Sequence, residues 1–225
     1  MDQKLDTNEA RKARRNARAE RRTVDPAVPR ERILNVAASL FRQRGYNGTT
    51  VRDIAAEVGI LSGSLFHHFQ SKEEILLEIM REAAFTICVR AEKTLEDAET
   101  PWQQLRELVR LELESIVGGV RKDYHAVLFF EWRDLPEAAK PELTRLQKRY
   151  NRSWRQAAEA CHAAGLLRCE PDAAVLILHG SVRGAMTWFR PGGRYSTDEF
   201  GDILTALVAI DIKDNGKDNH KGSKP

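Results

Sequence analysis

The sequence predicts an all-α protein of about nine helices, and three observations support this fold class. Apolar residues recur at helical spacing along most of the chain, Gly and Pro separate these segments, and no segment alternates with the period of two that a strand would show. We expect a basic disordered arm over residues 1–29, a helical head over 30–75, a larger helical domain over 76–212 and a disordered tail over 213–225.

The N-terminal arm is strongly basic. RKARRNARAERR at 11–22 contains seven basic residues and one acid. Residues 1–72 carry 14 Lys or Arg and 8 Asp or Glu, whereas the rest of the chain carries 22 and 25. A basic front half and a mildly acidic rear half indicate one module that binds nucleic acid and one with another role. The arm itself is either attracted to phosphates or a solubilising tail.

The first helix of the head shows the i, i+3, i+4, i+7, i+8 pattern of a core-facing helix. Gly45 ends it. The residues of this stripe are Ile33, Val36, Ala37, Leu40 and Phe41.

Two short helices follow, joined by a tight turn. Thr50 and Asp53 are spaced like a capping box, so a helix begins there. Gly59 supplies the positive φ that a turn needs, and Ser62 is expected to cap the next helix. In that helix Leu65 faces inward, which leaves an outer face. The outer face comprises Ser62, Gly63, Ser64, His67 and His68. This is the layout of a helix-turn-helix, whose second helix enters the DNA major groove.

A long helix is expected from Ser71 to Asp97, because Ser71 and Glu74 repeat the capping-box signature. Lys72 lies in its first turn, where a cation is unfavourable for the helix dipole unless an anion is close. A DNA phosphate would explain Lys72. The alternative is a solvated lysine at an exposed helix start.

The segments ILNVAASLFRQRGYNGTTVRDIA and GILSGSLFHHFQSKEEI resemble the DNA-binding domain of the TetR family of bacterial transcriptional repressors, over roughly Ile33 to Met80. Phe66 stands where the family most often has a tyrosine that touches a phosphate, so that contact is absent here. The resemblance and the outer face together assign the DNA-binding role to Thr49, Thr50, Arg52, Ser62, Gly63, Ser64, Leu65, His67, His68 and Lys72.

The adjacent residues His67 and His68 do not predict a metal site. Neighbouring residues point in different directions on a helix, and no Cys or acidic partner completes a zinc site nearby. One of the two histidines could instead be an ordinary core residue. We predict no metal and no cofactor.

The last helices show apolar stripes suited to assembly. In the TetR family the corresponding pair packs against its twofold mate as a four-helix bundle, so the resemblance implies a homodimer. The alternative is that these stripes close the core of the monomer. The residues assigned to dimerisation are Ala173, Ile177, Phe200, Ile203, Leu204 and Leu207.

The middle helices are rich in amphipathic side chains, which often line pockets but more often belong to a core. TWFRPGG at 187–193 resembles a segment of TetR repressors of steroid and fatty-acid degradation, a branch that senses acyl-CoA thioesters. Arg183 and Arg190 are then candidates for the CoA phosphates, although Arg190 could equally satisfy carbonyls at a helix end. The ligand-binding candidates are His125, Phe129, Trp132, Arg133, Trp154, His179, Arg183, Trp188 and Arg190.

The sequence lacks an apolar run of about 18 residues, a signal peptide and any catalytic motif. Its three cysteines are far apart, which suits a reducing compartment. We therefore expect a cytoplasmic, nucleoid-associated bacterial protein that is not an enzyme and contacts no membrane. The predicted function is a one-component repressor on a palindromic double-stranded operator, released by an acyl-CoA-like or steroid-derived effector. The alternatives are a regulator of efflux or stress genes with a drug-like ligand, and a nonspecific architectural DNA-binding protein.

Overall fold

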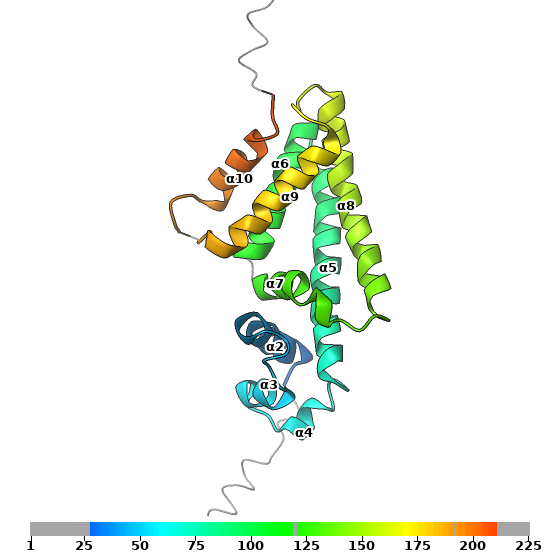
Figure 1. Ribbon diagram of the computed structural model, residues 1–225, viewed down its shortest axis with the longest axis vertical. Helices are drawn as coiled ribbons and strands as arrows, with labels where there is room; N and C mark the ends of the chain where they lie inside the picture. The colour runs from blue at the N-terminus through cyan, green and yellow to red at the C-terminus, as the bar shows by residue number, and fades with distance from the viewer. Residues whose placement is uncertain (1–27, 119–120, 191, 211–225) are drawn as a thin grey trace, which may run out of the picture. The chain divides into compact units, whose positions relative to one another are not determined.

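A computed structural model describes residues 28–118, 121–190 and 192–210, and over these ranges the chain is helical (Figure 1). The described residues form no strand beyond an isolated antiparallel bridge between Leu167 and Ala209, which confirms the all-α prediction. The basic arm up to residue 27 and the tail from 213 lie outside the described residues. The helices are α2 (Arg30–Arg44), α3 (Val51–Val58), α4 (Ser62–Leu65), α5 (Lys72–Asp97), α6 (Pro101–Val117), α7 (Lys122–Phe130), the 3-10 helix η1 (Trp132–Asp134), α8 (Lys140–Ala163), α9 (Pro171–Trp188) and α10 (Thr197–Ala206).

The chain divides into two compact units. The first unit contains the residues up to Met80 together with Val127–Pro136, and the second unit contains Arg81–Ala126 and the chain from Glu137 onward. Helices α5 and α7 each contribute to both units. The sequence analysis assigned 127–136 to the C-terminal domain, whereas the structure groups this segment with the helix-turn-helix.

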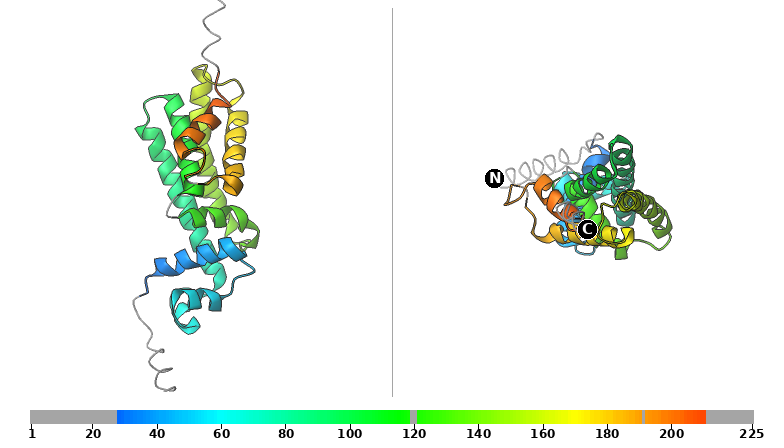
Figure 2. Two further views of the ribbon diagram at one scale, coloured as in Figure 1. Left: turned by 90° about the vertical axis from the view of Figure 1, so that its left-hand side faces the viewer. Right: turned by 90° about the horizontal axis from the view of Figure 1, so that it is seen from above.

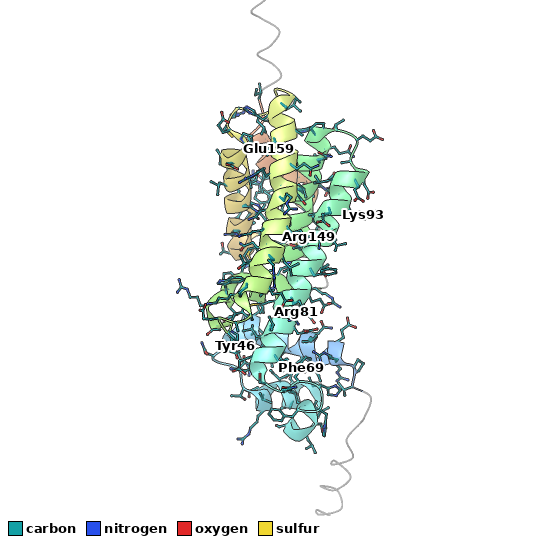
Figure 3. The ribbon with its side chains drawn as sticks, turned by 90° about the vertical axis from the view of Figure 1, so that its right-hand side faces the viewer. Tyr46, Phe69, Arg81, Lys93, Arg149 and Glu159 are labelled. Carbon is teal, nitrogen blue, oxygen red and sulfur yellow. The ribbon has the colours of Figure 1, made fainter. Side chains whose placement is uncertain are left out.

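The first unit packs α2, α3, α4 and the beginning of α5 around buried apolar side chains such as Phe41 and Phe69. Helix α2 ends at Gly45, which has φ 75°, and α3 ends at Gly59, which has φ 86°, as their glycines predict. The Thr50–Asp53 capping box is present. Tyr46 packs edge-on against Phe41 with ring centroids 5.3 Å apart. Tyr46 and Phe69 are both labelled in Figure 3.

The predicted cap of α4 is wrong. Leu61, not Ser62, occupies the N-cap position, and no side chain makes a capping hydrogen bond there. The backbone of Leu61 is extended, with ψ 145°, so the helix starts after it and Ser62 is already a helical residue. The α-helical part is only four residues long and continues as a hydrogen-bonded turn, in which the His68 amide donates to the Leu65 carbonyl at 2.9 Å.

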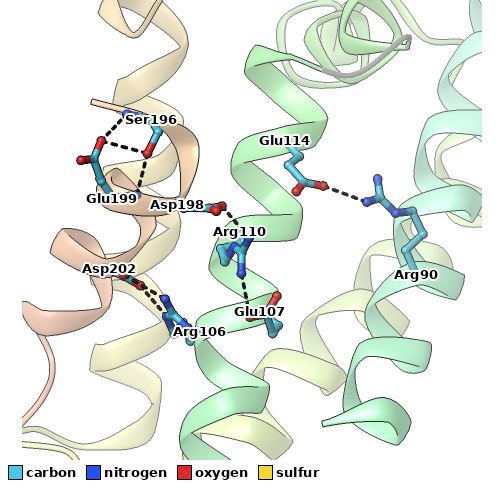
Figure 4. Close-up of polar contacts among 9 residues, drawn as sticks. All are labelled: Arg90, Arg106, Glu107, Arg110, Glu114, Ser196, Asp198, Glu199 and Asp202. Carbon is cyan, nitrogen blue, oxygen red and sulfur yellow. Dashed lines mark hydrogen bonds and ion pairs between the residues drawn. The ribbon is translucent and has the colours of Figure 1, made fainter. Parts of the chain in front are cut away.

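The second unit is a helical bundle in which α6, α8 and α9 pack on one another and α10 lies against α6 and α9 (Figure 2). Gly201 lets α10 approach α6 closely, because a Cβ atom there would lie 3.2 Å from Cγ of Arg110. Asp198 pairs with Arg110 at 2.5 Å, and Asp202 pairs with Arg106 (Figure 4). These contacts fix α10 along α6.

The long helices of the second unit also carry ion pairs between neighbours. Arg149 of α8 donates to the Glu92 carboxylate of α5 at 2.5 Å, and Arg81 donates to Glu142 at 2.6 Å. Arg81 and Arg149 are labelled in Figure 3. Such exposed pairs contribute at most about 1 kcal/mol each, so they set the helix register more than the stability. None of the described helices is long and apolar enough to cross a membrane.

Candidate nucleic-acid interface and effector site

The start of α3 and the α4 segment present an exposed face. We define the α4 segment as α4 together with the turn that continues it to His68. Thr50, Arg52, Gly63 and His67 are exposed, and His68 is half-buried. The capping box holds Thr50 in place, because its hydroxyl accepts from the Asp53 amide at 3.2 Å while the Asp53 carboxylate accepts from the Thr50 amide at 2.8 Å. The Thr50 hydroxyl also donates to the Asp53 carboxylate at 2.6 Å, and this bond together with the one from the Thr50 amide holds the pKa of Asp53 below its usual value. The carboxylate therefore remains an acceptor at neutral pH.

Three residues assigned to DNA binding are buried, and only one of them, Ser64, was expected on the outer face. Thr49 and Leu65 are fully buried, and Ser64 is 7% exposed. The Thr49 hydroxyl donates to the Gly45 carbonyl at 2.9 Å, so this side chain closes the α2–α3 loop. Leu65 packs in the core, and Ser64 precedes it on the same turn. A one-turn helix has few outward positions, and the side chains of Ser64 and Leu65 do not occupy them.

Gly63 is exposed, and nothing within its own unit requires a glycine at this position. A Cβ atom at this position would meet nothing within 4 Å, and the φ of Gly63 is not positive. Neither internal packing nor backbone conformation therefore requires glycine, although glycine costs a helix about 1 kcal/mol relative to alanine. The role of Gly63 in DNA binding stays a prediction, in which glycine would allow close approach of the DNA backbone.

Lys72 has a structural role that the sequence analysis did not foresee. Its Nζ donates to the carbonyl oxygens of Tyr46 and Thr49, both at 2.9 Å, and lies 3.9 Å from the centroid of the Tyr46 ring. These contacts explain a cation at the start of α5 without a phosphate. They leave one N–H of the three on the ammonium group for any other acceptor. Burial and a hydrogen bond to Glu73 raise the pKa of Tyr46.

Arg30 supports the other end of the α4 segment. Its guanidinium donates to the His68 carbonyl at 2.9 Å, stacks 4.1 Å above the Phe69 ring and lies 3.7 Å from the Glu74 carboxylate. The sequence analysis missed this residue, because Arg30 and His68 are 38 positions apart and no local pattern connects them.

The segment after α7 is attached to the α2–α3 loop. The Asn47 side-chain amide donates to the Asp134 carboxylate at 2.7 Å. Burial raises the pKa of the nearby Glu131, against a hydrogen bond from the Tyr46 backbone that lowers it. Three of the ligand-binding candidates lie within Val127–Pro136 of the first unit, one in α7 and two in η1, and are therefore not grouped with the candidates of the second unit. They are Phe129, Trp132 and Arg133.

In the second unit a polar cluster lies among the buried faces of α6, α8 and α9. We define the polar cluster as Glu112, Tyr150, Trp154 and His179. Nδ1 of His179 is 2.8 Å from Oε2 and 3.0 Å from Oε1 of Glu112, and Glu112 is 3% exposed. The His179 ring lies 4.4 Å from the Trp154 ring and 5.9 Å from the Tyr150 ring. Burial, followed by the charge of Glu112, raises the pKa of Tyr150 well above its ordinary value.

The sequence analysis selected Trp154 and His179 but missed Glu112 and Tyr150. A signal for Glu112 was available, because it follows the buried residues Leu105 and Leu108 by seven and four positions. An acid on the apolar stripe of a helix needs a buried partner. Tyr150 stands four residues before Trp154 on α8, but its proximity to Glu112 depends on helix packing.

The remaining candidates of the second unit do not converge on the polar cluster. His125 is buried, and desolvation together with the charge of Arg90 lowers its pKa to about 4. Trp188 is exposed and packs edge-on against Phe200 at 5.1 Å. Arg190 donates to the Phe189 carbonyl at 3.0 Å, which is the helix-end role given as the alternative. Arg183 is exposed, one turn after His179 on α9.

The stripes assigned to dimerisation divide between the core and the surface. Phe200 and Leu204 are 7% and 4% exposed, so they close the core of their own unit. Ile203 of α10 and Leu207 directly after it are 44% and 49% exposed, and Ile177 of α9 is 42% exposed. Ala173 is half-buried at the start of α9. Leu176 of α9 is also exposed, and the sequence analysis did not select it.

A helix-turn-helix with an exposed second helix is a surface that reads DNA, and comparisons with known proteins agree. The model described as bacterial regulatory proteins of the tetR family matches residues 33–79, and that of the tetracyclin repressor-like C-terminal domain matches residues 98–210. The chain is similar to the HTH-type transcriptional repressor KstR2 of Mycolicibacterium smegmatis, with 32% identity over 203 residues that cover 87% of this chain and 96% of that protein. The chain belongs to the TetR family and is a DNA-binding transcriptional repressor of that type, not an enzyme.

The chain is also similar in fold to several solved structures. A structure of AibR in complex with isovaleryl coenzyme A and operator DNA has a TM-score of 0.72 and 26% identity, covering 80% of this chain and 97% of that one. A structure of superantigen PfiT has a TM-score of 0.68 and 37% identity, covering 82% of this chain and 98% of that one. The ketosteroid transcriptional regulator KstR2 of Mycobacterium tuberculosis has a TM-score of 0.72 and 26% identity, covering 84% and 100%.

Proposed function

We propose that this repressor binds a palindromic operator as a homodimer and is released by an acyl-CoA thioester or a steroid-derived CoA thioester. The observation that carries the effector half of this proposal is the polar cluster within the second unit. Burying a carboxylate, an imidazole, a phenol and an indole side by side is unfavourable unless they have partners, and a domain that served only for dimerisation would not need them. The relatives AibR and KstR2 support the ligand class, since one was solved with isovaleryl coenzyme A and the other is described as a ketosteroid regulator.

The dimer is supported by the outer faces of α9 and α10. Leu176, Ile177, Ile203 and Leu207 are exposed large apolar residues on two helices that pack together. Such a face suits a second copy, because large exposed apolar patches are uncommon on monomers. Two copies place two α4 segments on one duplex and read a palindrome, whereas a single short helix offers few base contacts.

Release by ligand requires a difference in affinity between two states. The effector must bind the DNA-incompetent state more tightly than the DNA-bound state, because equal affinity shifts no population. Within the second unit, Trp154 and His179 are the candidates for the acyl part of the effector. Arg183 lies one turn beyond His179, so its guanidinium is the candidate for a CoA phosphate. Arg190 keeps N–H groups beyond the one that bonds Phe189, and its phosphate role stays a prediction.

A gel shift on the DNA upstream of its own gene tests this proposal, with each of several acids compared with its CoA thioester. We expect release by thioesters and not by the free acids. Release by a drug-like hydrophobic cation instead would favour a regulator of efflux or stress genes. Competition with random DNA tests the operator half, because a repressor favours its own site by about a thousandfold or more, whereas an architectural protein shows no preference.

A further inference from the structure

The polar cluster contains hydrogen-bonding atoms that the protein does not use. Nε1 of Trp154 and Nε2 of His179 are buried and have no hydrogen-bond partner among the described residues. The Tyr150 hydroxyl also forms no well-made hydrogen bond there, although Glu112 and Trp154 are close enough to change its pKa. The three rings that carry these atoms have centroids within 6.3 Å of one another. Such a group of unpaired atoms is unusual, because almost all buried polar groups in proteins form hydrogen bonds.

The unused atoms are mainly donors. The indole Nε1–H of Trp154 can only donate. Tyr150 keeps its proton at neutral pH, because burial and Glu112 raise its pKa, so its hydroxyl is also available to donate. Nδ1 of His179 is engaged with Glu112, which leaves Nε2 as the free position of the ring. A group that accepts hydrogen bonds would satisfy the two donors of this set, Trp154 and Tyr150.

The charge of the polar cluster limits which hydrogen-bond acceptor can bind there. Glu112 already places a buried carboxylate beside His179. A second carboxylate would be repelled, because like charges at close range in a low-dielectric interior are strongly unfavourable. A plain alkyl chain would leave the donors unpaired, which is unfavourable in a buried site. An uncharged oxygen avoids both penalties.

We propose that the polar cluster recognises an uncharged oxygen, a keto or hydroxyl group, on the acyl part of the effector. This rests on the proposed function and specifies it further, because it selects oxygenated acyl groups over saturated chains and over dicarboxylates. Trp154 and Tyr150 donate to that oxygen. Glu112 holds the His179 ring in position and accepts from a hydroxyl when the effector carries one.

Isothermal titration of the full-length protein tests this, with octanoyl-CoA compared with its beta-hydroxy, beta-keto and omega-hydroxy derivatives and with suberyl-CoA, which ends in a carboxylate. We expect at least one oxygenated thioester to bind about tenfold tighter than octanoyl-CoA, because a site built to hydrogen-bond an oxygen rejects the analogue that lacks it. Suberyl-CoA should bind more weakly than the omega-hydroxy derivative.

Variants assign the selectivity to the cluster. Tyr150→Phe removes one oxygen atom, and Trp154→Phe removes the indole donor. Each should reduce the preference for the oxygenated thioester over octanoyl-CoA by about fivefold. Tyr195→Phe is the matched control, since it removes the same atom from a half-buried tyrosine of the same unit and should leave the preference unchanged.

The outcomes separate the two proposals. If thioesters bind but octanoyl-CoA binds as tightly as every oxygenated derivative, the oxygen-recognition proposal is wrong and the CoA-thioester function stands. If Tyr150→Phe weakens all thioesters equally, Tyr150 is structural and oxygen recognition by this hydroxyl is wrong. If no thioester binds while the protein still binds its operator, the effector class is wrong and the present inference fails with it.

Discussion

The two units of this molecule differ in how some of their polar side chains are paired. In the first unit the Thr49 hydroxyl and the Lys72 ammonium donate to backbone carbonyls, and Arg30 is satisfied by His68 and two glutamates. In the second unit Trp154 and His179 keep buried nitrogen atoms without a partner among the described residues. These three groups of the first unit are therefore paired within the protein, whereas the polar cluster of the second unit keeps unused hydrogen-bonding atoms inside.

This difference matches what each unit has to do. A short recognition helix reads bases only when its angle is fixed, and a fully paired polar network supplies that rigidity. A ligand gains affinity when it forms hydrogen bonds with buried groups that are unpaired in the unliganded protein, and this suits an effector site. The contrast can be tested by removing one group at a time.

The largest expected effect is the acid sensitivity of His125 in the second unit. Its pKa of about 4 lies below the ordinary value near 6.5, so the unfolded chain takes up the proton first as the pH falls. Stability is then complete above about pH 6.5 and declines toward pH 4, by about 2 kcal/mol between pH 7 and pH 5. Urea unfolding at several pH values measures this loss.

His125→Leu removes the titrating group and serves as the comparison. The variant should lose much less stability between pH 7 and pH 5 than the parent protein, whatever its absolute stability. Carboxylates with lowered pKa values, such as Glu92 and Glu142, affect both proteins equally and mainly at lower pH. Parallel pH profiles for the two proteins would assign the acid sensitivity to other groups.

Lys72→Met tests whether the first unit depends on its paired frame. We expect the free energy of unfolding to fall by about 1.5 kcal/mol, because two charge-assisted hydrogen bonds and a cation–π contact are lost from a partly exposed site. Binding to operator and to random DNA should fall together, since the α2–α3 loop loosens without loss of a base contact. Lys93→Met removes an exposed i,i+4 pair with Asp97 and should change stability by less than about 0.5 kcal/mol.

Gly63→Ala tests the outer face of the α4 segment. The added methyl group meets nothing within the protein, so stability should stay equal or rise by about 0.5–1 kcal/mol. Operator affinity should nevertheless fall by about tenfold, because the methyl group obstructs close approach of the DNA. Fluorescence anisotropy on labelled operator measures the affinity. An unchanged affinity would mean that DNA does not approach Gly63 closely.

Local patterns in the sequence predicted much of the frame of the first unit. The Gly45 and Gly59 helix ends, the Thr50–Asp53 box and the inward Leu65 each depend on residues a few positions apart. The errors occurred where the local signal was ambiguous. Ser62 and Leu61 can both precede a helix, and only the extended backbone at Leu61 decides between them.

The polar contacts of the site were less predictable, because they join distant segments. Arg30 with His68, Asn47 with Asp134, and Glu112 with His179 are separated by 38, 87 and 67 positions. No period or cap encodes such pairs, and they exist only once the helices have packed. Composition did indicate that the middle helices held unusual polar and aromatic residues, but not which of them would meet.

Thr49→Val tests a single paired group of the first unit. The change keeps the shape of the side chain and removes the hydroxyl, so the Gly45 carbonyl loses its donor in a buried site. We expect a loss of about 1 kcal/mol in the free energy of unfolding. Thermal unfolding of the two proteins side by side measures it. A loss within error of zero would mean that the α2–α3 loop does not depend on this bond.

The smallest effect is expected for Tyr150→Phe in the absence of ligand, and it is the counterpart of Thr49→Val. Both changes remove one buried hydroxyl, but the Tyr150 hydroxyl makes no well-formed hydrogen bond that would be lost. Stability should change by less than about 0.5 kcal/mol, or even rise, because the cost of burying an unpaired polar atom disappears. A loss as large as that of Thr49→Val would show that Glu112 or Trp154 already satisfies this hydroxyl, and the contrast between the two units would then hold only for Trp154 and His179.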